Sequence, residues 1–344
     1  MDEYQFGLNT FGDVTVDADG KIKPMSQVLK DTVEQGVLAD KVGIDFIGIG
    51  EHHRDDYSVS APDIVLTAIA AQTENIYVGT AVTVLSSDDP IRVFQRFATL
   101  NAISDGRAEV IVGRGSFIES FPLFGYELKD YDMLFSEKAD LFMKLINSEG
   151  KPVSWEGTYR TPLKHVIVYP AVEKFTAWIG VGGTPASIIR AAEYNAPLAV
   201  AIIGGVPEKF IPHVKLYRDK LEQFGFTPQP VAVHSPGHVA KTDELAQEQA
   251  YKSYKETYEK LGRERGWNNT VTPMQYMAEV NGGSLYVGSP ETVAKRIAKT
   301  VQTLGVQRFD LKYATGTMPH EQLMESIELY GTEVIPMVKD ILNR

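Results

Sequence analysis

One stretch of the chain, residues 177–203, decides the fold: AWIGVGGTPASIIRAAEYNAPLAVAII. It contains an apolar run (Ala177–Gly182), a glycine turn, an amphipathic segment (Pro185–Tyr194) and a second apolar run (Leu198–Ile203). Continuous apolar runs are typical of strands that are covered on both faces, as in a parallel sheet. A proline suits the first turn of a helix, where its missing N–H is not needed. The stretch therefore predicts a strand–helix–strand unit.

The same alternation recurs along the whole chain. Further strands are predicted at Tyr4–Asn9, Phe46–Gly50, Ile76–Val82, Ala108–Gly113, Val231–Val239 and Arg308–Tyr313. Helices are predicted at Met25–Val42, Pro62–Gln72, Ile91–Ile103, Ser136–Ile146, Pro207–Phe224, Pro290–Leu304 and Pro319–Val338. Eight strands alternating with helices predict an α/β fold, a (β/α)8 TIM barrel forming a single domain over residues 1–344. A doubly wound open sheet with fewer strands is the alternative.

Two longer excursions interrupt this alternation, at Ser116–Lys164 and Ala240–Tyr286. We expect these insertions on the loops of the C-terminal face of the barrel, where function-bearing loops lie.

Composition excludes several classes of protein. Hydrophobic residues make up 43% of the 344 residues, and 34 Lys and Arg against 45 Asp and Glu give a net charge of −11. This acidic balance argues against nucleic acid or an anionic membrane as a partner. The chain has no cysteine, which excludes thiolate chemistry and disulfides. The N-terminus does not resemble a signal peptide and the apolar stretch at 196–206 is too short to span a bilayer, so we expect a cytoplasmic protein.

Two histidines follow the second predicted strand, in the segment Gly50–Asp56. Adjacent side chains on an extended chain point to opposite sides, so His52 and His53 cannot easily share one metal. No metal-ligand spacing is present elsewhere, and we predict no metal site. The alternatives are two solvated loop histidines, or one imidazole that enters the pocket as acid or base, with a pKa near the operating pH.

Anion-binding features follow the fourth and fifth predicted strands. Arg114 lies between two glycines at the end of one strand, and a guanidinium can hold a phosphate through two parallel hydrogen bonds. The turn Gly182–Ser187 leads from the next strand into a helix N-terminus, and Thr184 and Ser187 add hydroxyl donors. A salt bridge at Arg114 and simple helix capping are the structural alternatives. Because the two strands are consecutive, we expect one phosphate cradle.

Read together, these segments resemble the bacterial luciferase-like flavin monooxygenase family. The resemblance extends from Phe6 to about Val338. It rests on the order and spacing of Glu51–His53, Gly79–Val82, Arg96, Asp105–Arg107, Gly113–Gly115, Gly183–Ser187, Arg190–Glu193, Tyr286–Pro290 and Phe309–Glu321.

The resemblance implies that the C-terminal face of the barrel binds FMN in its reduced form. It implies that an arginine at Arg114 holds the flavin phosphate, that the flavin ring packs on the peptide Ala81–Val82, a cis bond in the luciferase subunit, and that His52 is the catalytic histidine. The cofactor-binding residues predicted in this way are Ala81, Val82, Arg114, Ser116, Gly182, Gly183, Thr184 and Ser187.

Two departures separate the chain from the luciferases. Gly113 stands where the luciferase subunit has a reactive cysteine, and the segment before Tyr286, a mobile lid in luciferase, is shorter. The resemblance thus implies a monooxygenase that uses reduced FMN and O2 on an unidentified small molecule, rather than a light-emitting enzyme. It also implies a homodimer. The chain has no nicotinamide-binding fingerprint, so a separate reductase is expected to supply the reduced flavin.

Three alternatives remain at this point. The chain could be a flavin-binding protein without catalysis, a deazaflavin-dependent dehydrogenase on the same barrel, or a lyase or isomerase barrel for a phosphorylated metabolite. The last class usually binds phosphate near strands seven and eight, whereas the anion features here follow strands four and five. We expect the pocket lining to include Phe11, Phe117, Tyr126 and Tyr313.

Overall fold

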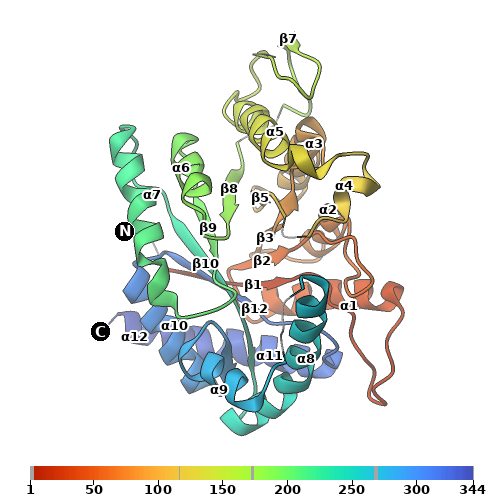
Figure 1. Cartoon of the computed structure of the whole chain (residues 1–344), viewed down its shortest axis with the longest axis vertical. Helices are drawn as coiled ribbons and strands as arrows, with labels where there is room; N and C mark the ends of the chain where they lie inside the picture. Colours follow the sequence, from red (N-terminus) through yellow and green to blue (C-terminus); the bar gives the residue numbers. More distant parts are fainter. Residues whose placement is uncertain (1–3, 116, 172–173, 267–269, 344) are drawn as a thin grey trace.

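The strands of the computed structural model close into a parallel barrel surrounded by helices (Figure 1). The structure describes residues 4–115, 117–171, 174–266 and 270–343. Hydrogen bonds join the strands in the order β3-β2-β1-β12-β10-β9-β8-β5-β4. A parallel bridge between Val78 and Ala108, the residue before β5, joins β3 to β5 and closes the barrel. The predicted (β/α)8 barrel is therefore confirmed. Its strands are β1 (Gln5–Thr10), β2 (Phe46–Ile49), β3 (Tyr77–Thr80), β4 (Thr83–Val84), β5 (Glu109–Gly113), β8 (Thr176–Val181), β9 (Leu198–Ala201), β10 (Val231–Val239) and β12 (Arg308–Lys312).

Two short strands, β3 and β4, together form the third strand of the barrel. β3 pairs with β2, β4 pairs with β5, and between them lie Ala81 and Val82, joined by a cis peptide bond. The third strand is therefore interrupted at the C-terminal end of the barrel, where the predicted site lies.

A helix follows each strand of the barrel, and most of these helices begin at or beside a proline. They are α1 (Met25–Lys41), α2 (Pro62–Ala70), α3 (Pro90–Ile103), α5 (Tyr131–Ile146), α6 (Pro185–Glu193), α7 (Ile211–Gln223), α10 (Pro290–Leu304) and α11 (His320–Leu329). A short turn, η2 (Pro207–Phe210), precedes α7, and a π-helical turn, η3 (Tyr330–Val334), leads into α12 (Ile335–Leu342). α5 begins five residues before its predicted start.

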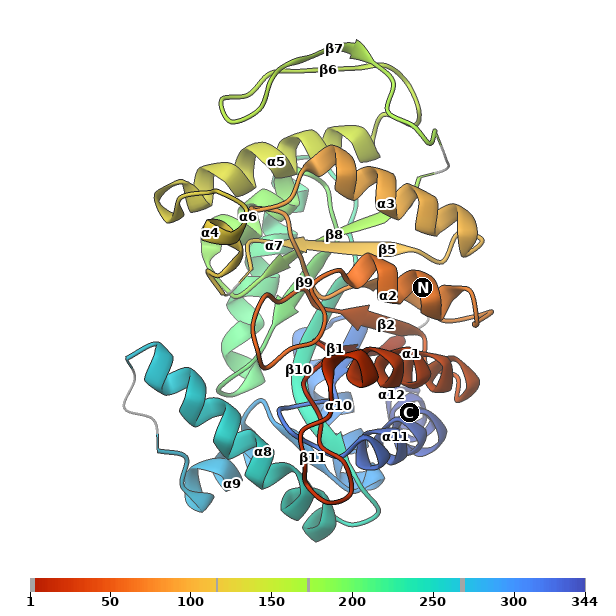
Figure 2. The ribbon, with the colours of Figure 1, turned by 90° about the vertical axis from the view of Figure 1, so that its right-hand side faces the viewer.

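The first predicted insertion divides between two places. Its first part, with α4 (Ser120–Leu123) and η1 (Leu128–Asp130), follows β5 at the C-terminal face as expected. The hairpin of β6 (Val153–Trp155) and β7 (Leu163–Val166) instead lies outside α5 and α3 (Figure 2). There the Trp155 indole donates to Asp140 of α5 at 2.8 Å. For the hairpin, the prediction of a C-terminal-face loop was wrong, because this segment follows the helix rather than the strand.

The second insertion forms a small lobe next to the C-terminal end of β10. It contains α8 (Asp243–Glu264) and α9 (Pro273–Gly282) and ends at β11 (Tyr286–Gly288), which pairs with β10. Tyr254 and Tyr276 pack at 5.3 Å in an apolar cluster separate from the main core. The lobe therefore carries its own core and holds α8 over the barrel mouth.

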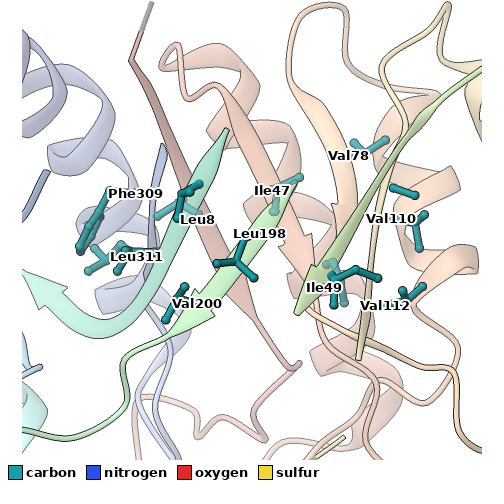
Figure 3. Close-up of a cluster of buried hydrophobic side chains, with 14 of the residues drawn as sticks. Leu8, Ile47, Ile49, Val78, Val110, Val112, Leu198, Val200, Phe309 and Leu311 are labelled. Carbon is teal, nitrogen blue, oxygen red and sulfur yellow. The ribbon is translucent and has the colours of Figure 1, made fainter. Parts of the chain in front are cut away.

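Side chains alternate between the two faces of the barrel wall, as the pleat of a strand requires. Those that face the helices form the main core, and Figure 3 shows part of it: Leu8, Ile47, Ile49, Val78, Val110, Val112, Leu198, Val200, Phe309 and Leu311. The interior holds a smaller cluster of Phe46, Ile111, Trp178, Ala199 and Ala232.

A buried ion cluster fills the interior toward the N-terminal ends of the strands. The Arg308 guanidinium contacts Glu109 at 2.6 Å and Asp310 at 3.2 Å, and lies 4.0 Å above the Phe46 ring and 4.2 Å from the Trp178 ring. Arg308 is 1% exposed. The cluster closes this end of the barrel, so access to the interior is left to the opposite end.

Candidate functional site

Arg114 and the glycine turn meet at the C-terminal end of the barrel. β5 and β8 are hydrogen-bonded neighbours, so the residues that follow them emerge side by side. Nη2 of Arg114 lies 3.4 Å from Oγ1 of Thr184, which lies 2.8 Å from Oγ of Ser187. Thr184 is the N-cap residue of α6, but its hydroxyl makes no capping hydrogen bond and faces Arg114 and Ser187 instead. One guanidinium and two hydroxyls therefore converge, as the sequence predicts.

The glycines of the turn leave room beside these donors. A Cβ atom at Gly182 would meet no atom within 4 Å, and Gly183 has a φ of +104°, which an L side chain rarely adopts. A Cβ at Gly183 would lie 3.5 Å from Nε2 of His213, a residue of α7 that the sequence did not suggest. Nδ1 of His213 is buried and has no partner among the described residues.

The Arg114 guanidinium also contacts a carboxylate. Asp132 of α5 contacts Nη1 of Arg114 at 2.6 Å, and its side chain is 71% exposed. Such an exposed pair contributes little stability, and the carboxylate can move into solvent when another anion binds. Ser116, which the sequence assigned to the same site, lies outside the described residues.

Val82 forms a ridge on the inner wall of the barrel, next to the Ala81–Val82 cis peptide. A Cβ on either Gly113 or Gly180 would come within 2.8 Å of the Val82 side chain. The backbone around the ridge is anchored to the loop after β2, since Oε2 of Glu51 accepts from the N–H of Val84 at 2.8 Å. Gly113 therefore has a packing role here, which the comparison with a cysteine did not suggest.

His52 lies in an aromatic pocket at the mouth of the barrel. Its ring is 4.5 Å from Phe11, 4.4 Å from Tyr57 and 5.0 Å from Phe117. Its Nε2 is buried without a partner among the described residues. Burial, aided by the Lys312 ammonium, lowers the pKa of His52 to about 3, so the expectation of a pKa near the operating pH was wrong. His52 is therefore a neutral imidazole with an unused nitrogen.

His53 turns to the other side of the same loop. Its Nε2 lies 2.9 Å from Oε1 of Glu51, and its ring packs on Phe124 at 5.1 Å. The two histidines thus diverge, as the extended backbone predicts.

Other polar groups in the mouth were missed by the sequence. His234 of β10 stacks on Phe11 at 6.1 Å, and its Nδ1 lies 2.6 Å from Nδ2 of Asn9. The Lys312 ammonium contacts Asp13 at 3.1 Å and lies 4.6 Å from the Phe11 ring. The only local signal was the presence of a histidine and a lysine within apolar strand runs.

Two of the four predicted lining residues lie elsewhere. Phe11 and Phe117 surround His52, but Tyr313 is fully buried and donates to Gln35 of α1 at 2.6 Å, and Tyr126 packs on the Lys138 ammonium at 4.0 Å. Tyr313 continues the outward-facing positions Phe309 and Leu311 of β12, which the sequence did not distinguish from inward ones.

One group of possible metal ligands lies away from the mouth, at α1 and α11. Atoms of Asp31, Glu34 and His320 lie within 4.8 Å of one another. The Lys23 ammonium already donates to Asp31 at 2.8 Å, and Gln35 contacts Nδ1 of His320 at 3.0 Å. The second oxygen of Asp31 accepts from Gln27 at 2.8 Å, and Nε2 of His320 lies 3.2 Å from Oε2 of Glu34.

Within the described ranges, no helix combines the length and apolarity that crossing a membrane requires.

Comparison with known proteins gives matches along most of the chain. The profile of the family described as luciferase-like monooxygenase matches residues 5–308. The alkanal monooxygenase alpha chain of Photorhabdus laumondii is 21% identical over 357 residues, covering 92% of this chain and 94% of that relative.

Solved structures share the fold. The monooxygenase RslO1 of Streptomyces bottropensis has a TM-score of 0.82 at 23% identity, over 96% of this chain and 99% of its own. The oxygenating constituent of 3,6-diketocamphane monooxygenase of Pseudomonas putida, in complex with FMN, has a TM-score of 0.76 at 19% identity, over 97% and 98%. An F420-dependent secondary alcohol dehydrogenase, in complex with an F420-acetone adduct, has a TM-score of 0.74 at 19% identity, over 98% and 99%.

Proposed function

The chain belongs to the luciferase-like monooxygenase family, and from this membership we propose that it is a monooxygenase that uses reduced FMN and O2 on a small organic substrate. Reduced flavin, when bound, supplies the electrons for reaction with O2. The protein's part is to bind the flavin, orient the substrate and keep water out.

The convergence of Arg114, Thr184 and Ser187 carries the proposal. A guanidinium beside two hydroxyls, next to the open space at Gly182, fits a phosphate group in size and charge. Arg114, Thr184 and Ser187 would hold that phosphate, with Gly182 and Gly183 giving it room. Asp132, now paired with Arg114, would yield to it.

The Ala81–Val82 segment would support the flavin ring. This segment lies directly before β4, which pairs with β5, the strand that leads to Arg114. A ligand held by its phosphate can therefore extend over the segment. Gly113 and Gly180, opposite Val82, make room for its side chain on the inner wall.

His52 would handle a proton at the reacting centre. As a neutral imidazole with an unpartnered Nε2, it can hydrogen-bond to flavin or substrate and orient the proton there, and its low pKa makes it a weak base. Phe117, which contacts His52, follows Arg114 by three residues and so connects this histidine to the phosphate cradle.

A deazaflavin-dependent dehydrogenase is the second candidate. The fold is about as similar to the F420-dependent alcohol dehydrogenase as to the FMN-bound monooxygenase constituent, with TM-scores of 0.74 and 0.76. FMN carries a phosphate monoester, which matches the compact cradle at Arg114 and favours the first candidate.

Binding of FMN tests the proposal directly. Purified protein should quench FMN fluorescence, and Arg114→Glu should weaken binding on the order of a hundredfold, because a charge-assisted contact contributes about 2–3 kcal/mol. Lys151→Glu is the matched control, since Lys151 is 78% exposed and remote from the mouth. Equal affinities of the wild type and Arg114→Glu would remove the cradle from the site.

Two further measurements separate the candidates. Substrate-dependent oxygen consumption with reduced FMN would support the monooxygenase, and its absence across all substrates would favour a non-catalytic flavin-binding protein. Competition between FMN and F420 would identify the dehydrogenase if F420 binds more tightly. A homodimer and a separate reductase that supplies reduced flavin remain predictions, which sedimentation and a coupled assay can check.

A further inference from the structure

The mouth of the barrel has two halves with different chemistry. Cationic and hydroxyl donors, from Arg114 to Ser187, follow β5 and β8. The other half lies over β10, β12, β1 and β2, which are neighbours in the sheet, and contains His234, Asn9 and His52 among aromatic rings. The proposed function uses His52 but gives no task to His234 or Asn9.

His234 points into the mouth because of its place in β10. Ala232, two residues earlier, belongs to the interior cluster, whereas Val231 and Val233 face the helices. His234 therefore continues the inner face one level closer to the C-terminal end of the strand. Its ring is half-buried and lies nearly parallel to Phe11, with an angle of 13° between the two planes.

Asn9 determines which nitrogen of His234 carries the proton. In this orientation of the amide, its nitrogen, a donor only, lies 2.6 Å from Nδ1 of His234, which makes Nδ1 the acceptor and puts the proton on Nε2. Asn9 is 1% exposed, and its Oδ1, which has no partner among the described residues, lies beside Gly48, where a Cβ would come within 2.1 Å of it. β1 thus holds the amide against the imidazole.

The second nitrogen of His234 is left for a ligand. Nε2 has no hydrogen-bond partner among the residues that the structure describes. Burial, with the nearby Lys312 ammonium, lowers the pKa of His234 to about 3, so the ring stays neutral near pH 7. The charge of Lys312 is balanced by Asp13 at 3.1 Å. Nε2–H is therefore a neutral donor in a mouth walled by aromatic rings.

We infer that His234 is a further substrate-contacting residue, whose Nε2–H donates to an oxygen acceptor of an uncharged substrate, and that Asn9 is the positioning residue that keeps it a donor. The inference rests on the proposed function for the presence of a substrate in this mouth. An uncharged carbonyl compound with an apolar body fits, because it offers an acceptor and no charge, whereas a carboxylate would have to compete with Asp13 for Lys312.

Nitrogen-15 NMR of histidine-labelled protein with oxidised FMN tests the tautomer. Only seven histidines are present, and His234→Gln assigns the signal. We expect Nε2–H and a bare Nδ1 on His234 between pH 6 and 8. In Asn9→Asp the carboxylate can only accept, so the proton should move to Nδ1. A wild-type protein with Nδ1–H, or an Asn9→Asp variant with no change, would overturn the inference.

Binding of matched probes tests the contact itself. Acetophenone and ethylbenzene, and cyclohexanone and methylcyclohexane, differ in the presence of the oxygen acceptor. With oxidised FMN bound, the ketone of at least one pair should bind about tenfold more tightly than its hydrocarbon, as one hydrogen bond allows. His234→Phe should abolish that preference. No binding by either pair, or a preference that persists in His234→Phe, would refute the substrate contact.

The same samples distinguish a failure of the proposed function from a failure of the roles of His234 and Asn9. FMN affinity and melting temperature are measured for every variant, with Asn9→Leu as a second variant if Asn9→Asp does not fold. A wild-type protein that fails to bind FMN contradicts the proposed function. Normal FMN binding with the wrong tautomer or no ketone preference contradicts only the role of Asn9 and His234.

Discussion

The two ends of the barrel interior both remove polar groups from water, but they do so differently. At the N-terminal end, Arg308, Glu109 and Asp310 offset one another's charge between two aromatic rings and are almost completely inaccessible. At the mouth, His52 and His234 are uncharged, each has an unused nitrogen, and both keep accessible surface. The difference teaches that burial alone does not mark a functional group. Here the candidates for function are the neutral side chains at the open end that have an unpartnered nitrogen.

The largest expected effect comes from disrupting the ion cluster at the N-terminal end of the barrel. Arg308→Met leaves two buried carboxylates without their cation, and we expect a loss of about 3–5 kcal/mol in the free energy of unfolding, measured by urea denaturation. Lys295→Met, which removes an exposed pair with Glu291, should change it by less than about 0.5 kcal/mol. An Arg308→Met variant with an unchanged free energy of unfolding would mean that the ion cluster is not what closes this end.

His52→Ala should separate function from stability at the mouth. We expect turnover with reduced FMN to fall by at least about a hundredfold, because a positioned acid or base contributes that much, while FMN affinity stays unchanged. The matched variant is His53→Ala, whose ring faces Glu51 and Phe124 instead, and it should slow turnover less. Undiminished turnover in His52→Ala would strike this residue from the site.

The two ends should respond to pH with opposite signs. The pKa of His234 is lowered from 6.5 to about 3, so its contribution to stability is complete above pH 6.5 and is lost as pH falls. The pKa of Asp310 is raised from 3.8 to about 6 by burial, so its contribution is complete below pH 3.8 and is lost as pH rises through 6.

Unfolding free energies between pH 4.5 and 6 measure this difference. His234→Gln should flatten the loss of stability on acidification by roughly 1 kcal/mol per pH unit, whereas Asp310→Asn should steepen it. If both variants changed the slope in the same direction, the contrast between the two ends would be refuted.

The smallest expected effect concerns the counter-charge of the cradle. Asp132→Asn removes the carboxylate that competes with a bound anion for Arg114, and FMN should bind about two- to fivefold more tightly, as exposed pairs contribute less than about 1 kcal/mol. Asp219→Asn, at an exposed pair on α7, is the control and should leave FMN affinity unchanged. Weaker binding in Asp132→Asn would indicate that Asp132 orients Arg114 for the ligand.

Much of the fold could be predicted because its signals are local. Val231–Val239 and Pro290–Leu304 begin and end where the apolar pattern indicates, and Ser289 caps its helix. Local patterns predicted less well where tertiary contacts decide the boundary. Ser60 and Thr317 also stand shortly before a helix, but Ala61 and Pro319 hold the N-cap positions there.

The sequence by itself determined the order of strands and helices, the glycine turn before α6 and the presence of an arginine at the end of β5. These depend on neighbours in the chain, whose periodicity and backbone preferences can be read directly. Only the tertiary structure decided that Asn9 meets His234, 225 positions away, and that Arg308 meets Glu109, 199 positions away. Closure of the barrel sets the register between strands, and register determines which inward side chains share a level and which of them have no partner.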